Sequence, residues 1–111
     1  MRQYEIWWAN LPAPAGKRPV LLLSRNDAYE YLSKVVVAEI TTTIRGIPVE
    51  IPLGRAEGLP KRCAANCDNF RTVARSWLAK RLGALAPARH AEVKRAVGYA
   101  LAWEELIMAG R

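Results

Sequence analysis

Hydrophobic positions in the N-terminal part of the chain gather into short runs that are separated by turn-forming residues. Aromatic and β-branched residues over 4–11 predict a first strand, and the Pro- and Gly-containing segment 12–16 ends it. The runs 19–23 and 35–38 are almost continuously apolar, which is typical of strands that are covered on both faces. We therefore expect these two runs to form the centre of a sheet.

The middle of the chain has a different pattern. Apolar residues occupy every second position of 47–53 and alternate with two prolines and a glutamate. Because proline cannot donate a ladder hydrogen bond, this segment is predicted to be an edge strand. Segment 63–73 can extend again, and 78–85 predicts a short last strand after a turn near 76–77.

Helical patterns occur in two places. Segment 26–32 predicts a short helical turn with Asn26 or Asp27 as its N-cap. Pro87, which is tolerated at a first helical position, opens a longer pattern that runs to Ile107. The apolar residues of this pattern recur with roughly helical spacing at Val93, Val97, Ala100, Leu101 and Leu106. One amphipathic helix is therefore expected to close the chain.

These elements account for most of the 111 residues, so we expect a single domain over 1–111 with one modest core. Five to seven short strands and one helix predict a mainly β fold, a small barrel or strongly bent antiparallel sheet with a C-terminal α-helix. A hydrophobic content of 51% excludes a disordered chain, and the apolar run 19–23 is too short to cross a bilayer. With no secretory-signal pattern at the N-terminus, a cytoplasmic location is expected.

Seventeen Lys and Arg residues against ten acidic residues give a net charge of +7, which predicts an anionic partner. Nucleic acid, an acidic protein segment or both would fit. A metal is not expected, because Cys63 and Cys67 are the only thiols and His90 lies elsewhere, on the predicted helix. On one strand the two thiols would be about 13 Å apart, too far to bridge each other, so both are expected to be free. No cofactor is expected.

Candidate chemistry lies at Arg18, which begins one central run, and at Thr41, which ends the next. In an antiparallel pair, residues that lie opposite each other share a midpoint in number. The midpoint of 18 and 41 is 29.5, and that of the connection 25–33 is 29. Arg18 and Thr41 are therefore expected to be near neighbours across the ladder.

A guanidinium beside a hydroxyl can bind a phosphodiester, because arginine offers a planar fork of donors to two phosphate oxygens. In metal-free RNA cleavage the 2′-hydroxyl attacks phosphorus, so the site must stabilise added charge and manage two proton transfers. Threonine is a poor base, and the spacing leaves the base unassigned. On spacing alone, a surface arginine and a hydrogen-bonding threonine at a strand end are the favoured interpretation.

Four sequence blocks change that balance. Residues 5–8 (EIWW), 17–24 (KRPVLLLS), 35–41 (VVVAEIT) and 68–73 (DNFRTV) resemble, in the same order, the successive blocks of the MazF/PemK toxin family. With the C-terminal helix they cover nearly the whole chain. The Arg-Pro-Val block alone is weak evidence, whereas four ordered blocks in a chain of the family's size are strong evidence.

The resemblance implies an SH3-like barrel of the CcdB/MazF/Kid kind, a homodimer, and the toxin of a type II toxin–antitoxin system. It also implies sequence-specific, metal-independent and ribosome-independent cleavage of single-stranded RNA. The products would be 2′,3′-cyclic phosphate and 5′-hydroxyl ends, and translation and growth would be inhibited. Messenger RNA is the expected substrate, with ribosomal or transfer RNA as alternatives. An acidic MazE-like antitoxin is the expected inhibitor.

The resemblance assigns roles to individual residues. Arg18 and Thr41 match the family's catalytic pair. Asp68 matches an acid that contributes to catalysis in some members, and a turn-forming aspartate is an equally good interpretation. Arg71 is expected to support the site or the dimer rather than to catalyse.

The residues expected to contact RNA are Lys17, Trp8, Arg45 and Arg71. The loop 12–17 is shorter than in many members and offers only Lys17, which puts the substrate range in doubt. Trp7 and Trp8 are adjacent on a strand and point to opposite faces, so at most one of them can stack on a base at a given surface. For any single loop cation, solvated charge is the commoner explanation.

Two other functions fit a small basic β domain. A gyrase-binding toxin of the CcdB kind would need no Arg18/Thr41 pair, and its determinants would lie in the C-terminal helix. A plain nucleic-acid-binding module would bind RNA without turnover, so Arg18→Ala would weaken binding rather than abolish a reaction.

Overall fold

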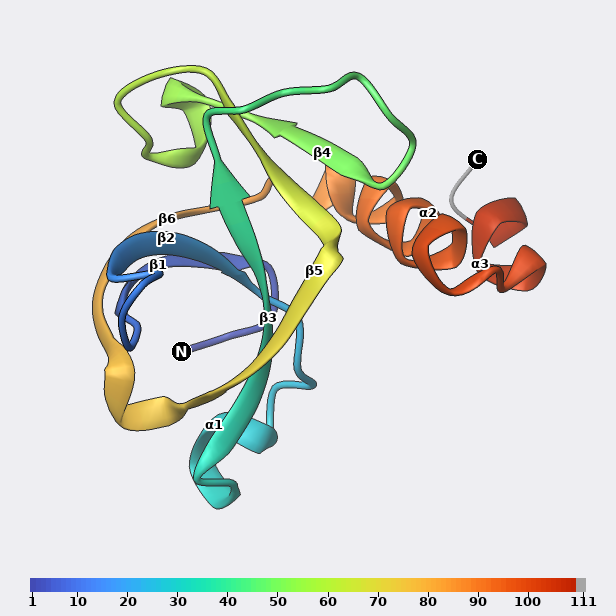
Figure 1. Cartoon of the computed structure of the whole chain (residues 1–111). Helices are drawn as coiled ribbons and strands as arrows, with labels where there is room; N and C mark the ends of the chain where they lie inside the picture. The colour runs from blue at the N-terminus through green and yellow to red at the C-terminus, as the bar shows by residue number, and fades with distance from the viewer. Residues whose placement is uncertain (110–111) are drawn as a thin grey trace.

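The computed structural model describes residues 1–109, which form a curled antiparallel sheet with the C-terminal helices beside it (Figure 1). The strands of this part of the chain are β1 (Glu5–Asn10), β2 (Lys17–Leu22), β3 (Lys34–Thr41), β4 (Glu50–Leu53), β5 (Cys63–Ala74) and β6 (Leu78–Ala84). The α-helices are α1 (Ala28–Tyr31), α2 (His90–Leu101) and α3 (Glu104–Ala109). Short 3₁₀ turns form η1 (Arg55–Glu57), η2 (Arg75–Trp77) and η3 (Pro87–Arg89).

The strand order in the sheet is β4-β5-β3-β2-β1-β6, and every neighbouring pair is antiparallel. The two apolar runs form the central strands β2 and β3, as predicted, and the proline-containing segment lies at an edge. Its pairing begins only at Glu50, whose backbone N–H closes a turn on the carbonyl of Ile47 at 3.0 Å. The expected mainly β fold is confirmed as a curled half-barrel.

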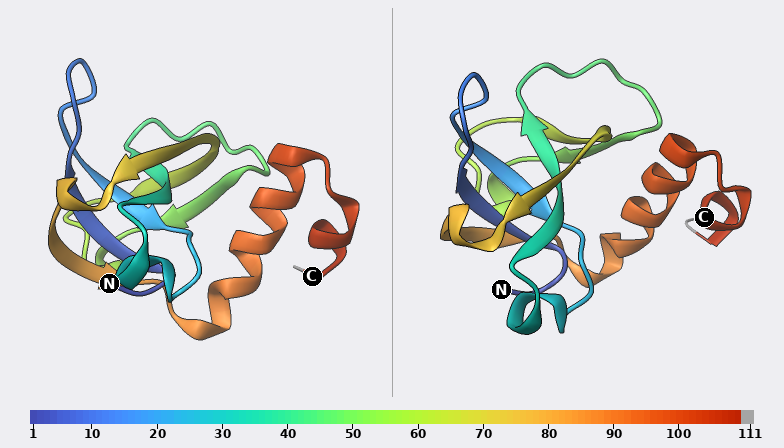
Figure 2. Two further views of the ribbon diagram at one scale, coloured as in Figure 1. Left: turned by 90° about the horizontal axis from the view of Figure 1, so that it is seen from below. Right: turned by 60° about the horizontal axis from the view of Figure 1, so that its bottom comes forward.

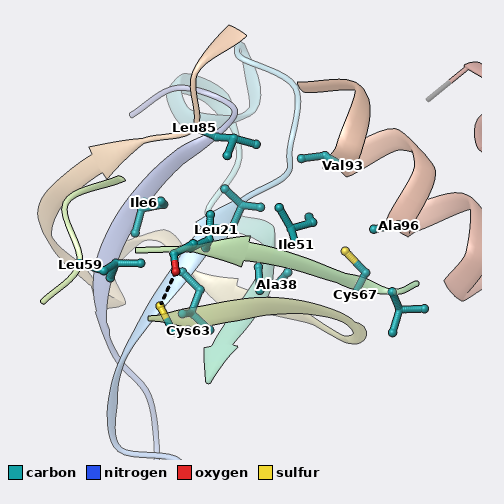
Figure 3. Close-up of a cluster of buried hydrophobic side chains, with 14 residues drawn as sticks. Ile6, Leu21, Ala38, Ile51, Leu59, Cys63, Cys67, Leu85, Val93 and Ala96 are labelled. Carbon is teal, nitrogen blue, oxygen red and sulfur yellow. Dashed lines mark hydrogen bonds between the residues drawn. The ribbon is translucent and has the colours of Figure 1, made fainter. Parts of the chain in front are cut away.

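The curl gives the sheet a separate core on each face. In β2, Leu21 enters a first core, which α2 covers through Val93 and Ala96 (Figure 3). Val20 and Leu22, which point the other way, enter a second core closed by α1 and η2. Because neighbouring residues of the same strand are buried in different cores, the strand reads as a continuous apolar run rather than an alternating one.

The C-terminal part differs from the single helix predicted. After α2 the backbone of Ala102 is left-handed, with φ 56°, and the chain turns back into α3. The N–H of Trp103 donates to the carbonyl of Gly98 at 2.8 Å, and a Cβ at Gly98 would lie 2.7 Å from the backbone nitrogen of Ile107. Glycine therefore gives α3 room to pack on α2. Helix α2 ends at its C-cap residue, Ala102. Because alanine is the best helix former, the sequence does not indicate a helix end at this position.

A buried carboxylate connects the edge of the sheet to the start of α2. Glu57 accepts a hydrogen bond from the backbone N–H of Gly54 at 2.7 Å and lies 3.5 Å from the guanidinium of Arg89. Arg89 also donates to Glu92 at 2.8 Å and to the carbonyl of Pro52 at 2.6 Å. These contacts fix the position of α2 against β4 and η1.

Cys63 and Cys67 lie buried in β5 and are free, as predicted. Burial raises the pKa of both thiols, that of Cys67 to about 12, so neither is a reactive thiolate at neutral pH. In the part of the chain that the structure describes, no group of three or more His, Cys, Asp and Glu side chains could hold a metal ion. Across residues 1–109 there is also no helix with the length and apolar character needed to span a membrane.

Candidate active site

The β2–β3 register sets the relation between Arg18 and Thr41. The ladder pairs Val20 with Glu39 and Leu22 with Val37, so the numbers of opposite residues sum to 59 (20 + 39 and 22 + 37). Continued by two residues, the same register places Arg18 opposite Thr41, because 18 + 41 is also 59. The structure confirms the register expected from the length of the connection, in a ladder whose last pair, Val20 and Glu39, lies two residues before Arg18 and Thr41.

Thr41 ends β3 with a hydroxyl that is partly engaged. Its Oγ1 accepts a hydrogen bond from the backbone N–H of Thr43 at 3.1 Å, and its side chain is half-buried. A hydroxyl has one hydrogen to donate and two lone pairs, so this contact leaves the hydrogen available. Thr41 is therefore placed to donate to an anion at the end of the strand.

Glu39 is a part of the site that we did not predict from the sequence. Its carboxylate lies 3.2 Å from Nη1 of Arg18 and 3.8 Å from Nη1 of Arg71, and only 17% of its side chain is exposed. The signal was present, because Glu39 is the one charged residue in the otherwise apolar run 35–40. A charge in a strand that is covered on both faces requires a partner.

A bulge in β5 lies directly beside Glu39. Ala38 pairs with Phe70, but the next residue, Glu39, pairs with Asn66, so residues 67–69 are left out of the ladder. Asp68 lies in this bulge with an exposed side chain, and its backbone N–H donates to Oδ1 of Asn66 at 2.8 Å. Within residues 1–109 its carboxylate forms no ion pair with Arg18 or Arg71. The structure brings Arg71 to Arg18 through Glu39 and leaves Asp68 facing solvent.

An apolar cleft of about 270 Å³ opens at the same end of the sheet. It is lined by Trp8, Pro19, Ile40, Thr41, Thr42, Gly58, Leu59, Pro60, Lys61, Cys63 and Leu82. Trp8 pairs with Pro19, whereas Trp7 pairs with Val20, which places the two indoles on opposite faces as predicted. The indole N–H of Trp7 donates to Glu5 at 3.0 Å and its ring packs on the second core, so Trp8 is the indole that lines the cleft with Thr41.

Two further residues expected to contact RNA, Lys17 and Arg45, lie beside this end of the sheet. Lys17 is exposed at the start of β2, next to the β1–β2 loop that projects from the molecule (Figure 2). Arg45 is exposed in the β3–β4 loop. Burial alone would raise the pKa of Glu50, but hydrogen bonds from the backbone N–H groups of Arg45, Ile47 and Gly46 hold it below its usual value. That carboxylate therefore shapes the loop that presents Arg45.

His90, which matched no expected catalytic position, is packed within the fold. Its ring stacks on that of Tyr4, with centroids 3.6 Å apart, and its Nε2 lies 3.1 Å from the carbonyl oxygen of Leu85. The structure thus gives His90 a role in packing at the start of α2.

Comparisons with known proteins agree with the sequence blocks. The family described as PemK-like, MazF-like toxin of type II toxin-antitoxin system matches residues 2–101. A probable endoribonuclease MazF5 from Mycobacterium tuberculosis is 42% identical over 86 residues, which are 77% of this chain and 78% of that protein. Structural neighbours of this chain include the M. tuberculosis toxin MazF-mt6, with a TM-score of 0.83 and 34% identity over 88% of this chain and 96% of the other. An endoribonuclease in complex with its cognate antitoxin, from a mycobacterial species, has a TM-score of 0.80 and 26% identity over 93% and 96% of the two chains.

These matches cover most of the chain and most of each relative, in sequence and in fold. The chain belongs to the PemK-like, MazF-like family of toxins of type II toxin–antitoxin systems.

Proposed function

We propose that this chain is an endoribonuclease toxin that cleaves single-stranded RNA, and that Arg18 and Thr41 are its catalytic residues. The observation that supports the proposal is the β2–β3 register, which, continued by two residues, would bring a partly exposed guanidinium opposite a strand-end hydroxyl, in a chain whose relatives are named endoribonucleases. The net charge of +7 supports an RNA substrate.

The proposed reaction is a transesterification that needs no metal. The 2′-oxygen forms a bond to phosphorus while the bond between phosphorus and the 5′-oxygen breaks. The 2′-hydroxyl loses a proton to a base and the 5′-oxygen gains one, so the products are a 2′,3′-cyclic phosphate and a 5′-hydroxyl. The protein must stabilise the negative charge that develops on the phosphate oxygens.

Arg18 and Thr41 can divide this work. The guanidinium of Arg18 carries five N–H donors, and an ion pair with Glu39 leaves others free for two phosphate oxygens. The hydroxyl of Thr41 accepts from Thr43 and can donate to a third oxygen. Asp68 is an exposed residue in the bulge that follows Asn66, the residue paired with Glu39. Its carboxylate is proposed to contribute to proton transfer.

The same end of the sheet is proposed to bind the flanking nucleotides. Lys17, Arg45 and Arg71 provide positive charge for the RNA backbone. Trp8 lines the cleft beside Thr41 and offers an apolar surface for a base. This division predicts that the cations affect binding to all sequences, whereas Trp8→Ala changes which sequences are cut.

The partners are proposed on separate grounds. An acidic MazE-like antitoxin fits the basic surface, and a mycobacterial neighbour was solved with its cognate antitoxin. A homodimer would cover the exposed apolar side chains at the C-terminal end, which are Tyr99, Leu101, Trp103 and Met108. With cellular RNA as its substrate, the protein is proposed to act in the cytoplasm.

Light scattering on the purified chain tests the dimer, and inhibition of cleavage by a polyglutamate peptide at low salt tests the acidic partner.

The activity is tested by incubating the purified protein with a long single-stranded RNA in excess EDTA and mapping the cut ends. The parent should cut at one short motif and leave cyclic phosphates. Arg18→Ala and Thr41→Ala should be slower by at least about a hundredfold, and Thr41→Ser, which keeps the hydroxyl, should retain most of the rate. Arg25→Ala is the matched control, because Arg25 is 70% exposed and lies beyond the opposite end of β2.

Two results would contradict the proposal in different ways. If folded Arg18→Ala and Thr41→Ala cut RNA as fast as the parent, the site is wrong. If the folded parent cuts no RNA, the activity itself is wrong, and a toxin that binds a target without cleaving it becomes the better description.

A further inference from the structure

Glu39 lies on the same face of the sheet as the two proposed catalytic residues. It is two residues before Thr41 in β3, and strand residues two apart share a face. It pairs with Val20 in β2, which is two residues after Arg18. Its carboxylate therefore lies beside the guanidinium of Arg18, which is proposed to bind the phosphate.

An acid at this place works against RNA binding. A carboxylate repels a phosphate, and a surface that only had to hold RNA would do so better with a neutral residue here. Only 17% of the Glu39 side chain is exposed, so most of the hydration of its charge is lost in the folded protein. An unfavourable charge in this position requires a compensating role.

The contacts of Glu39 indicate that role. Its two oxygens face two guanidinium groups, at 3.2 Å from Arg18 and 3.8 Å from Arg71. Arg18 is 36% exposed, and among residues 1–109 Glu39 is the only acidic side chain within ion-pair distance of it. A long, partly exposed arginine without such a contact would sample many rotamers.

We propose that Glu39 is a positioning residue that holds the guanidinium of Arg18 in place for the developing phosphate charge, at the expense of RNA affinity. The inference rests on the proposed ribonuclease function. Arg71 completes the arrangement by sharing the carboxylate, which leaves the three side chains with one net positive charge, two cations and one anion. Glu39 thus orients the guanidinium of Arg18 without itself touching the RNA.

The proposal makes cleavage and binding respond in opposite directions. In Glu39→Gln the side chain keeps its shape and loses its charge. We expect kcat to fall by about ten- to a hundredfold, because small misplacements of a catalytic group are costly. Affinity for the mapped substrate RNA carrying a 2′-deoxynucleotide at the cut position should stay equal or become about two- to fivefold tighter, the range of one partly exposed charge interaction.

A second readout follows Arg18 directly and does not depend on activity. ¹⁵N relaxation of its Nε–H group, assigned by comparison with Arg18→Lys, should give a rigid group in the parent and an order parameter below about 0.6 in Glu39→Gln. Glu5→Gln is the matched control. Glu5 is 14% exposed and pairs with Arg81 at 3.0 Å, and it lies four residues along β1 from Ala9, the residue opposite Arg18. This control should change neither kcat, affinity nor the Arg18 signal.

Each outcome decides the matter. The inference is overturned if Glu39→Gln leaves Arg18 as rigid as in the parent, if it cuts RNA at the parental rate, or if its rate and its affinity fall together as they would for a damaged fold. If the parent cuts no RNA, the proposed function has failed, and the order of the Arg18 side chain alone then supports or overturns the positioning by Glu39.

Discussion

Two clusters of arginine and glutamate in this molecule have opposite charge balance. The helix cluster is made of Arg89, Glu57 and Glu92, and the strand cluster is made of Glu39, Arg18 and Arg71. The first has one cation and two anions, a net charge of −1, and the second has two cations and one anion, a net charge of +1. The comparison separates an ion-pair network that holds structural elements together from one that keeps a net positive charge available to bind an anion.

In the helix cluster the donors of Arg89 are used within the fold. Its guanidinium contacts both carboxylates and the carbonyl of Pro52. The hydrogen bond from Arg89 lowers the pKa of Glu92, and the same bond raises the pKa of Arg89. The cluster is therefore expected to serve stability alone.

In the strand cluster the contacts are fewer and longer, and one of the cations is 36% exposed at the end of the sheet. A surplus positive charge with free donors is a site for an anion. The same residue types thus serve different purposes, and the difference lies in how completely their hydrogen-bonding groups are used. Four substitutions, taken from the largest expected effect to the smallest, can break or sharpen this comparison.

Arg18→Lys tests whether the strand cluster needs the guanidinium fork or only its charge. Lysine keeps the charge but cannot give two parallel hydrogen bonds to a phosphate. We expect cleavage to fall about a hundredfold, while RNA affinity and the free energy of unfolding change little. Single-turnover cleavage, fluorescence anisotropy with labelled RNA and urea unfolding measure the three quantities. A variant with near-parental cleavage would show that charge suffices.

Arg89→Ala should have the reverse effect in the helix cluster. It leaves the carboxylate of Glu57 buried without its cation, which costs about 2–3 kcal/mol of unfolding free energy. Thermal unfolding should show a large fall in Tm, and the cleavage rate of the remaining folded protein should be near the parental value. A stable variant would mean that Glu57 is satisfied by the Gly54 N–H alone.

Arg71→Gln removes the cation that touches Glu39 at the longer distance. We expect RNA affinity to fall by about fivefold and the slope of log affinity against log salt to become shallower by about one, because one fewer counterion is released. Fluorescence anisotropy across a salt series measures both. An unchanged slope would place Arg71 outside the RNA contact and leave it a structural role.

Glu92→Gln gives the smallest effect, and it depends on pH. The pKa of Glu92 is lowered from its ordinary value of 4.5, so its ion pair stabilises the fold above that pH and is lost as the pH falls through the folded-state pKa. At pH 7 the variant should be less stable by up to about 1 kcal/mol. The difference from the parent should shrink as the pH falls below 4.5 and disappear once the pH is below the lowered folded-state pKa. Unfolding at pH 7 and across a series of acidic pH values checks this, and a constant difference would argue for a packing effect.

Much of the sheet could be predicted because its signals are local. The continuous apolar runs of β2 and β3 identified the centre, and the prolines at 48 and 52 identified an edge. The helix after Pro87 was also found, although its division at Ala102 was missed because the stop depends on the packing of Gly98 against α3. Local propensity favours a continuing helix at that alanine, and a tertiary contact overrides it.

The sequence by itself determined the register of β2 and β3, because one short connection fixes the register of two consecutive antiparallel strands, and from that register it predicts that Arg18 and Thr41 are neighbours. Only the tertiary structure decided that the carboxylate of Glu39 lies between the guanidinium groups of Arg18 and Arg71. That contact crosses from β3 to β5, over 32 residues (71 − 39), and its register contains a bulge at 67–69. The length of a connection cannot reveal a bulge, because the bulge depends on how both strands pack against their neighbours.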